Sequence, residues 1–157
     1  MSRYFPVFLN LEGRKALLFG AGNIGCRRLE RLLAFGVFVT VVAPDLSQNA
    51  RSLAQEYPGQ VQLEQRAYLP GEISGVDLVL SATDSPEADG MIYEECRAKR
   101  IPVNIAADQS KCDFYFPAVV EHDGLVIGIT SGGNDHRKVR RFSAWLRQAL
   151  AKKEDGV

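Results

Sequence analysis

The chain has 157 residues, and nineteen basic side chains balance nineteen acidic ones. This length suits one domain of ordinary size with a short appendage and is too small for two independent hydrophobic cores. A hydrophobic fraction of 46% and a charged fraction of 24% are typical of globular proteins and exclude a disordered chain, a collagen-like chain or a disulfide mini-protein. Because the charges balance, no whole-molecule field attracts nucleic acid or an anionic membrane.

The cysteines and the N-terminal residues indicate a cytoplasmic protein with no membrane segment. Cys26, Cys96 and Cys112 have no metal-type spacing, so we expect free thiols and no metal site. Residues 1–15 contain no cleavage site of the secretory kind. No run in the chain approaches the roughly 18 apolar residues of a membrane helix.

The first elements form a repeating unit. Residues 15–19 are a short apolar run that leads into a glycine turn, as a buried strand does. Leucines at helical spacing follow, and Gly36 lies where a helix C-cap is expected. Residues 37–42 are rich in β-branched side chains and stop before Pro44, which favours a second buried strand. This order predicts a βαβ unit with parallel strands.

The same alternation continues as far as residue 113. Helices are predicted over residues 48–57 and 86–100, and strands over residues 61–66, 76–82 and 102–106. Residues 1–113 are therefore predicted to form an α/β domain, a Rossmann-like, doubly wound parallel sheet with helices on both faces.

Beyond residue 113 the pattern changes to two β-rich runs and a last helix. Residues 114–120 and 125–130 flank an Asp-Gly pair, which is a strong hairpin signal. The helix after residue 135 carries a broad apolar stripe that includes Phe142 and Trp145. Because this tail is too small to bury the stripe, we expect residues 114–157 to be a dimerisation segment, a β-hairpin and helix that join a homodimer.

The most informative motif is Gly-Ala-Gly-Asn-Ile-Gly at residues 20–25. Gly20, Gly22 and Gly25 would permit a sharp turn, close approach of a pyrophosphate and tight packing of helix on strand. The following helix N-terminus would offer N–H groups to the phosphates. Because the motif follows a predicted strand and opens a predicted helix, it favours a dinucleotide site over a purely structural turn.

Two further segments extend this site. Asp45 comes about 20 residues after the glycine motif, where dinucleotide-binding proteins carry an acidic residue for the adenosine ribose. It follows Pro44, so a plain turn aspartate is the competing interpretation, but its charge would disfavour a ribose phosphate and so favours NAD over NADP. Residues 81–84 either lie against the nicotinamide half of the cofactor or form an ordinary loop capped by Asp84 or Ser85.

Residues 104–113 form a polar loop after the last predicted strand of the sheet, where reacting groups are common in this architecture. Asp108 and Asp113 are its only carboxylates, and each is either a general base or a surface charge. In the tail, a glycine turn and a run of cations suit a ligand with several carboxylates, although a solvated helix face explains the cations equally well. These tail residues are Ser131, Gly132, Gly133, Arg137, Lys138, Arg140 and Arg141.

Four segments together resemble the precorrin-2 dehydrogenase family, which includes the N-terminal module of siroheme synthase. They are the opening from Tyr4 through the glycine motif to Pro44, SATD at 81–84, NIAADQSKCDFYFPAVV at 104–120, and ITSGG at 129–133. The segments keep the family's order and spacing, and CDFYFPAVV is far more specific than any glycine motif. A ligand-gating Rossmann module of an ion channel would leave CDFYFPAVV and ITSGG unexplained.

The resemblance implies NAD-dependent oxidation of precorrin-2, a tetrapyrrole, to sirohydrochlorin in siroheme biosynthesis, by a cytoplasmic homodimer. It also implies that the basic cluster binds the carboxylates of the substrate. Some members insert ferrous iron into the product, so residual ferrochelatase activity is part of the expectation. The residues that the resemblance places against NAD are Asn23, Ile24, Pro44, Asp45 and Thr83, together with the motif glycines.

Two departures from the family bear on the chemistry. The family's aspartate three residues after Asn104 is replaced by Ala107, and the nearest carboxylate, Asp108, becomes the expected base. The longer members also have a further helical region over the tetrapyrrole, so we expect an open or incomplete substrate cleft. Ser131 falls where siroheme synthase carries a phosphorylatable serine. The alternative function is a non-catalytic, NAD-responsive homologue that binds a tetrapyrrole.

Overall fold

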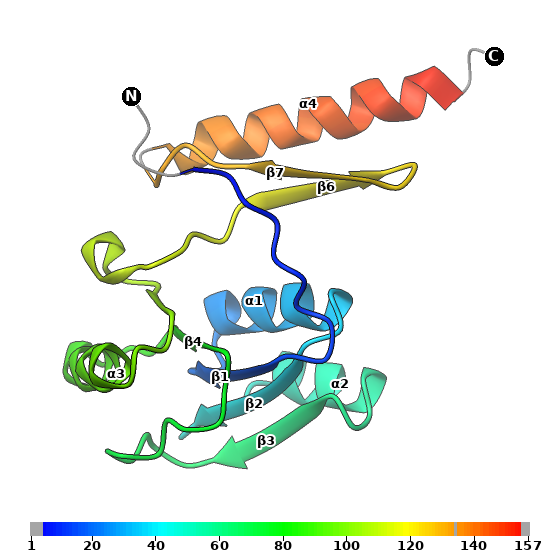
Figure 1. The fold of residues 1–157 in the computed structure, drawn as a ribbon. Helices are drawn as coiled ribbons and strands as arrows, with labels where there is room; N and C mark the ends of the chain where they lie inside the picture. The colour runs from blue at the N-terminus through cyan, green and yellow to red at the C-terminus, as the bar shows by residue number, and fades with distance from the viewer. Residues whose placement is uncertain (1–4, 134, 155–157) are drawn as a thin grey trace. The chain divides into compact units, whose positions relative to one another are not determined.

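The computed structural model describes residues 5–133 and 135–154. The chain divides into two compact units, drawn in Figure 1. One unit is Leu9–Phe114, and the other joins Met1–Phe8 to Tyr115–Val157. The start of the chain therefore groups with its C-terminal part. The functional assignment of residues 1–113 to cofactor binding and of residues 114–157 to dimerisation stays a prediction.

The larger unit is built on a five-stranded parallel sheet. Its strand order is β3-β2-β1-β4-β5, so the winding reverses between β1 and β4. In doubly wound sheets, ligands bind outside the carboxyl ends of the strands at this switch point. The order confirms the predicted Rossmann-like fold. The strands are β1 (Lys15–Phe19), β2 (Phe38–Ala43), β3 (Val61–Gln65), β4 (Leu78–Ser81) and β5 (Val103–Ile105).

Three α-helices accompany this sheet. They are α1 (Asn23–Ala34), α2 (Gln48–Glu56) and α3 (Pro86–Lys99). Because βαβ crossovers are right-handed, α1 and α2 lie on one face of the sheet and α3 lies on the other. A short 3-10 turn, η1 (Gln109–Lys111), follows β5.

The side chains of β1 alternate between the two faces of the sheet. Leu17 and Phe19 belong to the hydrophobic cluster that also contains Ile92 and Cys96 of α3. Leu18 is fully buried and points to the opposite face, which α1 covers. Burial on both faces explains why the strand sequences are continuous apolar runs.

Residues 66–77, here called the crossing segment, lead from β3 to β4 without a helix. Ile73 of this segment is fully buried in the core on the α3 side. Glu95 of α3 accepts hydrogen bonds from the backbone N–H groups of Gly71 at 2.9 Å and Ile73 at 2.8 Å, and from the Tyr68 hydroxyl. One carboxylate therefore fastens the crossing segment to α3.

The smaller unit consists of a β-hairpin and a helix. β6 (Ala118–His122) and β7 (Leu125–Ile129) pair antiparallel, and α4 (His136–Glu154) packs along β6 (Figure 1). Asp123 and Gly124 have φ angles of 45° and 74°. Two successive positive φ angles are the mark of a type I′ turn, as the Asp-Gly pair predicts.

The first strand of the hairpin begins later than the sequence predicts. The prediction is residues 114–120, whereas β6 begins at Ala118. Pro117 has no N–H with which to join a ladder, so the strand starts directly after it. The strand then continues to His122, because a two-residue turn is enough to reverse the chain.

The apolar stripe of α4 is only partly covered. Its Ser143 is buried, and the Arg147 side chain donates to the Val119 carbonyl oxygen of β6 at 2.9 Å. Phe142 and Trp145 contact each other with ring centroids 5.4 Å apart and remain 49% and 58% exposed. Of the helices in the described residues, none has the length and apolarity that a bilayer span requires.

Candidate functional site

The three motif glycines have different surroundings. Gly20 has a φ of 94°, and a Cβ there would lie 2.2 Å from the Ala82 carbonyl oxygen. A Cβ on Gly25 would lie 2.2 Å from the Gly20 carbonyl oxygen. By contrast, no atom beyond the adjoining residues lies within 4 Å of a Cβ on Gly22. The first and last glycines are therefore required by packing, whereas the space beside Gly22 is open, as a pyrophosphate needs.

The N-terminus of α1 supplies donors to this open space. The first hydrogen bond of the helix runs from the Cys26 N–H to the Gly22 carbonyl oxygen at 2.9 Å. The N–H groups of Asn23, Ile24 and Gly25 precede it and have no acceptor within the helix. Gly22 provides no side-chain cap, and the first turn contains no acidic residue. This positively polarised helix end, with room beside it, fits the diphosphate of a dinucleotide.

Backbone hydrogen bonds hold the glycine loop between two strands. The Gly20 N–H donates to the Val42 carbonyl oxygen of β2 at 2.9 Å, and the Ala82 N–H donates to the Phe19 carbonyl oxygen of β1 at 2.8 Å. The loop therefore lies at the switch point, next to the carboxyl ends of β2 and β4. Its position is set by the sheet and not by flexible side chains.

The predicted adenosine end lies after β2. Val42 is the register partner of Phe19, so Pro44 and Asp45 leave the sheet beside the residues that follow β1. Both are exposed. The cap of α2 is Ser47, whose hydroxyl accepts a backbone N–H. Asp45 is therefore not needed as that cap, and its role on the ribose stays a prediction.

A buried carboxylate that sequence reasoning missed lies at the other end of the loop. Asp89 of α3 is only 5% exposed. Its Oδ1 accepts hydrogen bonds from the Ser81 hydroxyl at 2.5 Å and the Thr83 hydroxyl at 2.7 Å. The helix cap is Ser85, one of the two predicted candidates. Helical spacing could have indicated its burial. Asp89 comes three residues before Ile92, so the two side chains lie on the same face of α3, and Ile92 is buried.

The Arg28 side chain of α1 also lies at the carboxyl end of β4. One Nη of its guanidinium donates to the Ser81 carbonyl oxygen at 3.5 Å. Burial lowers the pKa of Arg28, while the nearby Cys112 and Asp89 act in the opposite direction. The carboxyl end of β4 is therefore surrounded by one buried carboxylate, one guanidinium and two hydroxyls.

The predicted base lies on the loop after β5. Asp108 caps η1, and its Oδ1 accepts from the Ser110 hydroxyl at 2.6 Å and the Ser110 N–H at 3.0 Å. These bonds, with the Lys111 ammonium 3.9 Å away, hold the pKa of Asp108 below its ordinary value. The carboxylate is therefore ionised at neutral pH and is a weaker base than an unbonded aspartate. Ala107 beside it is exposed.

Two other polar side chains of this loop, Asp113 and Asn104, bind backbone groups. Asp113 accepts the Val103 N–H at 3.0 Å and pairs with the Arg97 guanidinium at 3.5 Å. The buried Asn104 donates to the Phe114 carbonyl oxygen at 2.7 Å, while its own side-chain oxygen has no hydrogen-bond partner. Among the described residues there is no cluster of histidine, cysteine or acidic side chains that could hold a metal ion.

The predicted substrate-binding residues lie at the start of α4. Gly132 and Gly133 have positive φ angles of 64° and 81°, and the Ser131 hydroxyl accepts the Asp135 N–H at 2.9 Å. Asp135 in turn caps the helix by accepting the Lys138 N–H at 2.8 Å. All four predicted cations, Arg137, Lys138, Arg140 and Arg141, are exposed. They belong to the smaller unit and the glycine loop to the larger, so their substrate role stays a prediction.

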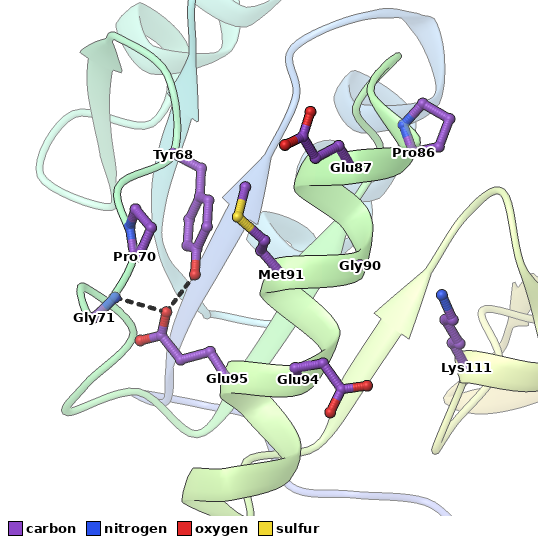
Figure 2. Close-up of a pocket in the computed structure, with 10 residues that line it drawn as sticks. All are labelled: Tyr68, Pro70, Gly71, Pro86, Glu87, Gly90, Met91, Glu94, Glu95 and Lys111. Atoms are coloured by element: carbon purple, nitrogen blue, oxygen red, sulfur yellow. Dashed lines mark hydrogen bonds between the residues drawn. The ribbon is translucent and has the colours of Figure 1, made fainter.

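A groove of about 630 Å³ runs between α3 and the crossing segment (Figure 2). Figure 2 shows the Met91 side chain beside the Tyr68 ring, and Glu95 hydrogen-bonded to Tyr68 and Gly71. None of the predicted site residues lines this groove. Its lining is Tyr68, Pro70, Gly71, Pro86, Glu87, Gly90, Met91, Glu94, Glu95 and Lys111.

Known proteins resemble the chain in sequence. Residues 7–118 match the family described as Putative NAD(P)-binding. Siroheme synthase 2 of Halorhodospira halophila is 38% identical over 130 residues, which cover 83% of this chain and 26% of that protein. Siroheme synthase of Pseudomonas entomophila is 33% identical over 150 residues, which cover 93% of this chain and 32% of that protein. The chain thus spans between a quarter and a third of the length of these relatives.

A solved structure also resembles the chain. SirC, a precorrin-2 dehydrogenase, aligns with a TM-score of 0.76 at 24% identity, covering 93% of this chain and 71% of that chain. This likeness shows a shared fold. Together with the two siroheme synthases, it confirms the resemblance that the sequence segments indicate.

Proposed function

The chain belongs to the family described as Putative NAD(P)-binding, and on that premise we propose that it is an NAD-dependent dehydrogenase that oxidises precorrin-2 to sirohydrochlorin in siroheme biosynthesis. The observation that carries the proposal is the open space at Gly22 beneath the uncapped N-terminus of α1. The names of the siroheme synthase relatives supply the biosynthetic context, and the name of the precorrin-2 dehydrogenase SirC supplies the substrate. The cytoplasmic location predicted from the sequence remains part of this proposal.

The cofactor would be held by the ends of three strands. The N–H groups of Asn23, Ile24 and Gly25 bind the diphosphate, and Asp45 binds the adenosine ribose. The carboxylate of Asp45 repels a ribose phosphate, which favours NAD over NADP. Thr83 flanks the cofactor at the end of β4. When bound, NAD supplies the hydride acceptor.

The chain's own residues would handle the proton and the substrate. Oxidation removes a hydride and a proton from neighbouring atoms of precorrin-2, and the ionised carboxylate of Asp108 accepts the proton. The exposed cations of α4 pair with the carboxylates of the tetrapyrrole. A second copy of the chain would complete the enzyme by covering Phe142 and Trp145. The proposal includes no nucleic-acid or membrane partner.

One observation favours a second candidate, a non-catalytic homologue that binds NAD and a tetrapyrrole. The Asp108 carboxylate is occupied by Ser110 and Lys111, and the neighbouring Ala107 has no ionisable group. A loop built in this way holds its shape well but offers a weak base. Iron insertion also needs a placed base, so this loop does not support the residual ferrochelatase activity that the resemblance implies, and the proposal leaves that activity out.

A turnover assay separates the two candidates. The purified protein is mixed with NAD and precorrin-2, and NADH formation is followed by its absorbance. We expect turnover, and we expect Asp108→Asn to lower it by about a hundredfold, within the range typical of a lost general base. Glu56→Gln, which removes an exposed carboxylate at the end of α2, serves as the control and should keep full activity.

Each remaining outcome has a defined meaning. Equal turnover by Asp108→Asn and the unaltered protein would show that Asp108 is not the base. Tight NAD binding in calorimetry without any turnover would identify the non-catalytic homologue. A protein that binds neither NAD nor precorrin-2 would contradict both candidates.

A further inference from the structure

Asp89 is a buried charge that the proposed reaction does not use. The residue is 5% exposed, and the two hydrogen bonds to its Oδ1 come from the neutral hydroxyls of Ser81 and Thr83. A neutral acceptor such as an asparagine could receive the same two bonds at a lower desolvation cost. The geometry of the turn therefore does not by itself explain why this acceptor is ionisable.

The turn that Asp89 holds is part of the cofactor loop. Ser81 and Thr83 flank Ala82, whose carbonyl oxygen lies so close to Gly20 that no Cβ fits between them. The Ala82 N–H is also bonded to the Phe19 carbonyl oxygen of β1. Asp89 therefore fixes the part of the switch point contributed by β4. In doubly wound sheets the second half of a dinucleotide lies on this side of the switch.

The two redox states of the nicotinamide differ in charge. The ring of NAD⁺ carries a positive charge, and the ring of NADH is neutral. A fixed negative charge in a poorly solvated place favours the positive ring, and the effect is much stronger there than in water. Arg28, which interacts electrostatically with Asp89, partly offsets this negative charge.

We infer that Asp89 is a positioning residue whose charge sets the preference of the site for oxidised over reduced NAD. The inference rests on the proposed function, since it requires the cofactor to bind at the glycine loop. It assigns two effects to one side chain: its oxygen orders the Ser81–Thr83 turn, and its charge disfavours NADH relative to NAD⁺. For an enzyme that consumes NAD⁺, this preference helps product release.

The test measures dissociation constants of NAD⁺, NADH and ADP-ribose by calorimetry for the full chain. Asp89→Asn keeps an acceptor for both hydroxyls and removes the charge. We expect the ratio of the NADH to the NAD⁺ dissociation constant to fall by about three- to tenfold. The affinity for ADP-ribose, which lacks the nicotinamide, should stay within about twofold. Glu87→Gln removes an exposed charge from the first turn of the same helix and should leave the ratio unchanged.

A second variant removes the positive charge near Asp89 instead of the negative one. Arg28→Gln removes the offsetting positive charge, so the ratio should rise, by at least about twofold. This variant keeps the inference falsifiable if Asp89→Asn does not fold. If both variants fold and neither changes the ratio of the NADH to the NAD⁺ dissociation constant, the inference is overturned. If only Arg28→Gln folds, an unchanged ratio in that variant overturns it. If the unaltered protein binds none of the three nucleotides, the proposed function fails and the inference falls with it.

Discussion

Gly20, Gly22 and Gly25 form one motif in the sequence but meet three different environments in the fold. Gly20 and Gly25 are glycines because backbone carbonyl oxygens occupy the places of their side chains. Gly22 has an ordinary φ of −76° and open space beside it, so neither backbone strain nor packing requires a glycine. The chain's own structure therefore leaves the space beside Gly22 open, at the helix end where the proposed diphosphate would lie.

Substitutions at two of these glycines should therefore separate binding from stability. Gly22→Ala should leave the melting temperature nearly unchanged and weaken NAD binding by at least about tenfold, because the methyl group fills the diphosphate space. Gly25→Ala should destabilise the fold by about 1–3 kcal/mol, the usual cost of overpacking. Thermal denaturation and calorimetry on the same samples provide both readouts. Undiminished NAD affinity in Gly22→Ala would contradict this role.

Residue roles were predictable where they follow from local sequence. The glycine motif and the Asp-Gly turn each combine residue types whose backbone preferences are known. The roles of Asp89 and Glu95 were not predictable in the same way. Each carboxylate meets partners brought together only by the packing of α3 against the sheet and the crossing segment, and no local pattern encodes that packing.

At the scale of elements, the crossing segment depends on Glu95. Burial alone would raise the pKa of Glu95, but bonds from the Lys99 ammonium, the Tyr68 hydroxyl and two backbone N–H groups outweigh it and lower the pKa to about 2. Because the folded pKa lies below the ordinary value of 4.5, the stabilisation is complete above about pH 4.5. It is lost as the pH falls from there through about 2.

Substitution of Glu95 tests this stabilisation, and the neighbouring Glu94 of the same helix provides a control. Glu95→Gln should lower the free energy of unfolding at pH 7 by about 1–3 kcal/mol, because a charged acceptor of several hydrogen bonds is lost. Urea denaturation at pH 7 and pH 3 should show the gap between the unaltered protein and Glu95→Gln narrowing at the lower pH. The exposed Glu94→Gln should change stability by less than about 0.5 kcal/mol. A gap that widens on acidification would refute the role of Glu95.

Element boundaries were predictable to different degrees. The buried parallel strands and their helices follow from apolar runs, caps and glycine turns, and the order of elements along the chain gives the doubly wound topology. The start of β6 was misplaced because residues 114–116 are as aromatic as a strand. Whether such residues join a strand ladder depends on which backbone N–H groups can donate hydrogen bonds. Pro117 has no N–H group, and it lies directly before the observed start of β6.

At the scale of the whole molecule, the exposed aromatic pair on α4 is the feature that a single chain leaves unexplained. We expect Trp145→Glu to shift the mass in light scattering from dimer to monomer, because a buried charge at an apolar interface is costly. Gln148→Glu, which changes an exposed residue of the same helix, should leave the dimer intact. A dimer that survives Trp145→Glu at micromolar concentration would place the interface elsewhere.

The proposed function rests mainly on resemblance. Composition and charge excluded broad classes, and the glycine motif with its strand and helix indicated a dinucleotide. The proposed substrate follows only from segments such as CDFYFPAVV, which carry no chemistry that elementary principles would connect to a tetrapyrrole. The balanced net charge gave no hint of a polyanionic ligand, whereas the local run of four cations at the start of α4 was visible in the sequence, and all four side chains are exposed.

The proposed function requires a diphosphate held by the first N–H groups of α1, and amide chemical shifts report on those groups directly. A titration of isotope-labelled protein with NAD should produce saturable shifts in the amide signals of Asn23, Ile24 and Gly25, with smaller shifts on the distant β3. If NAD leaves these three amides unperturbed while other signals move, the cofactor binds elsewhere and the account is wrong.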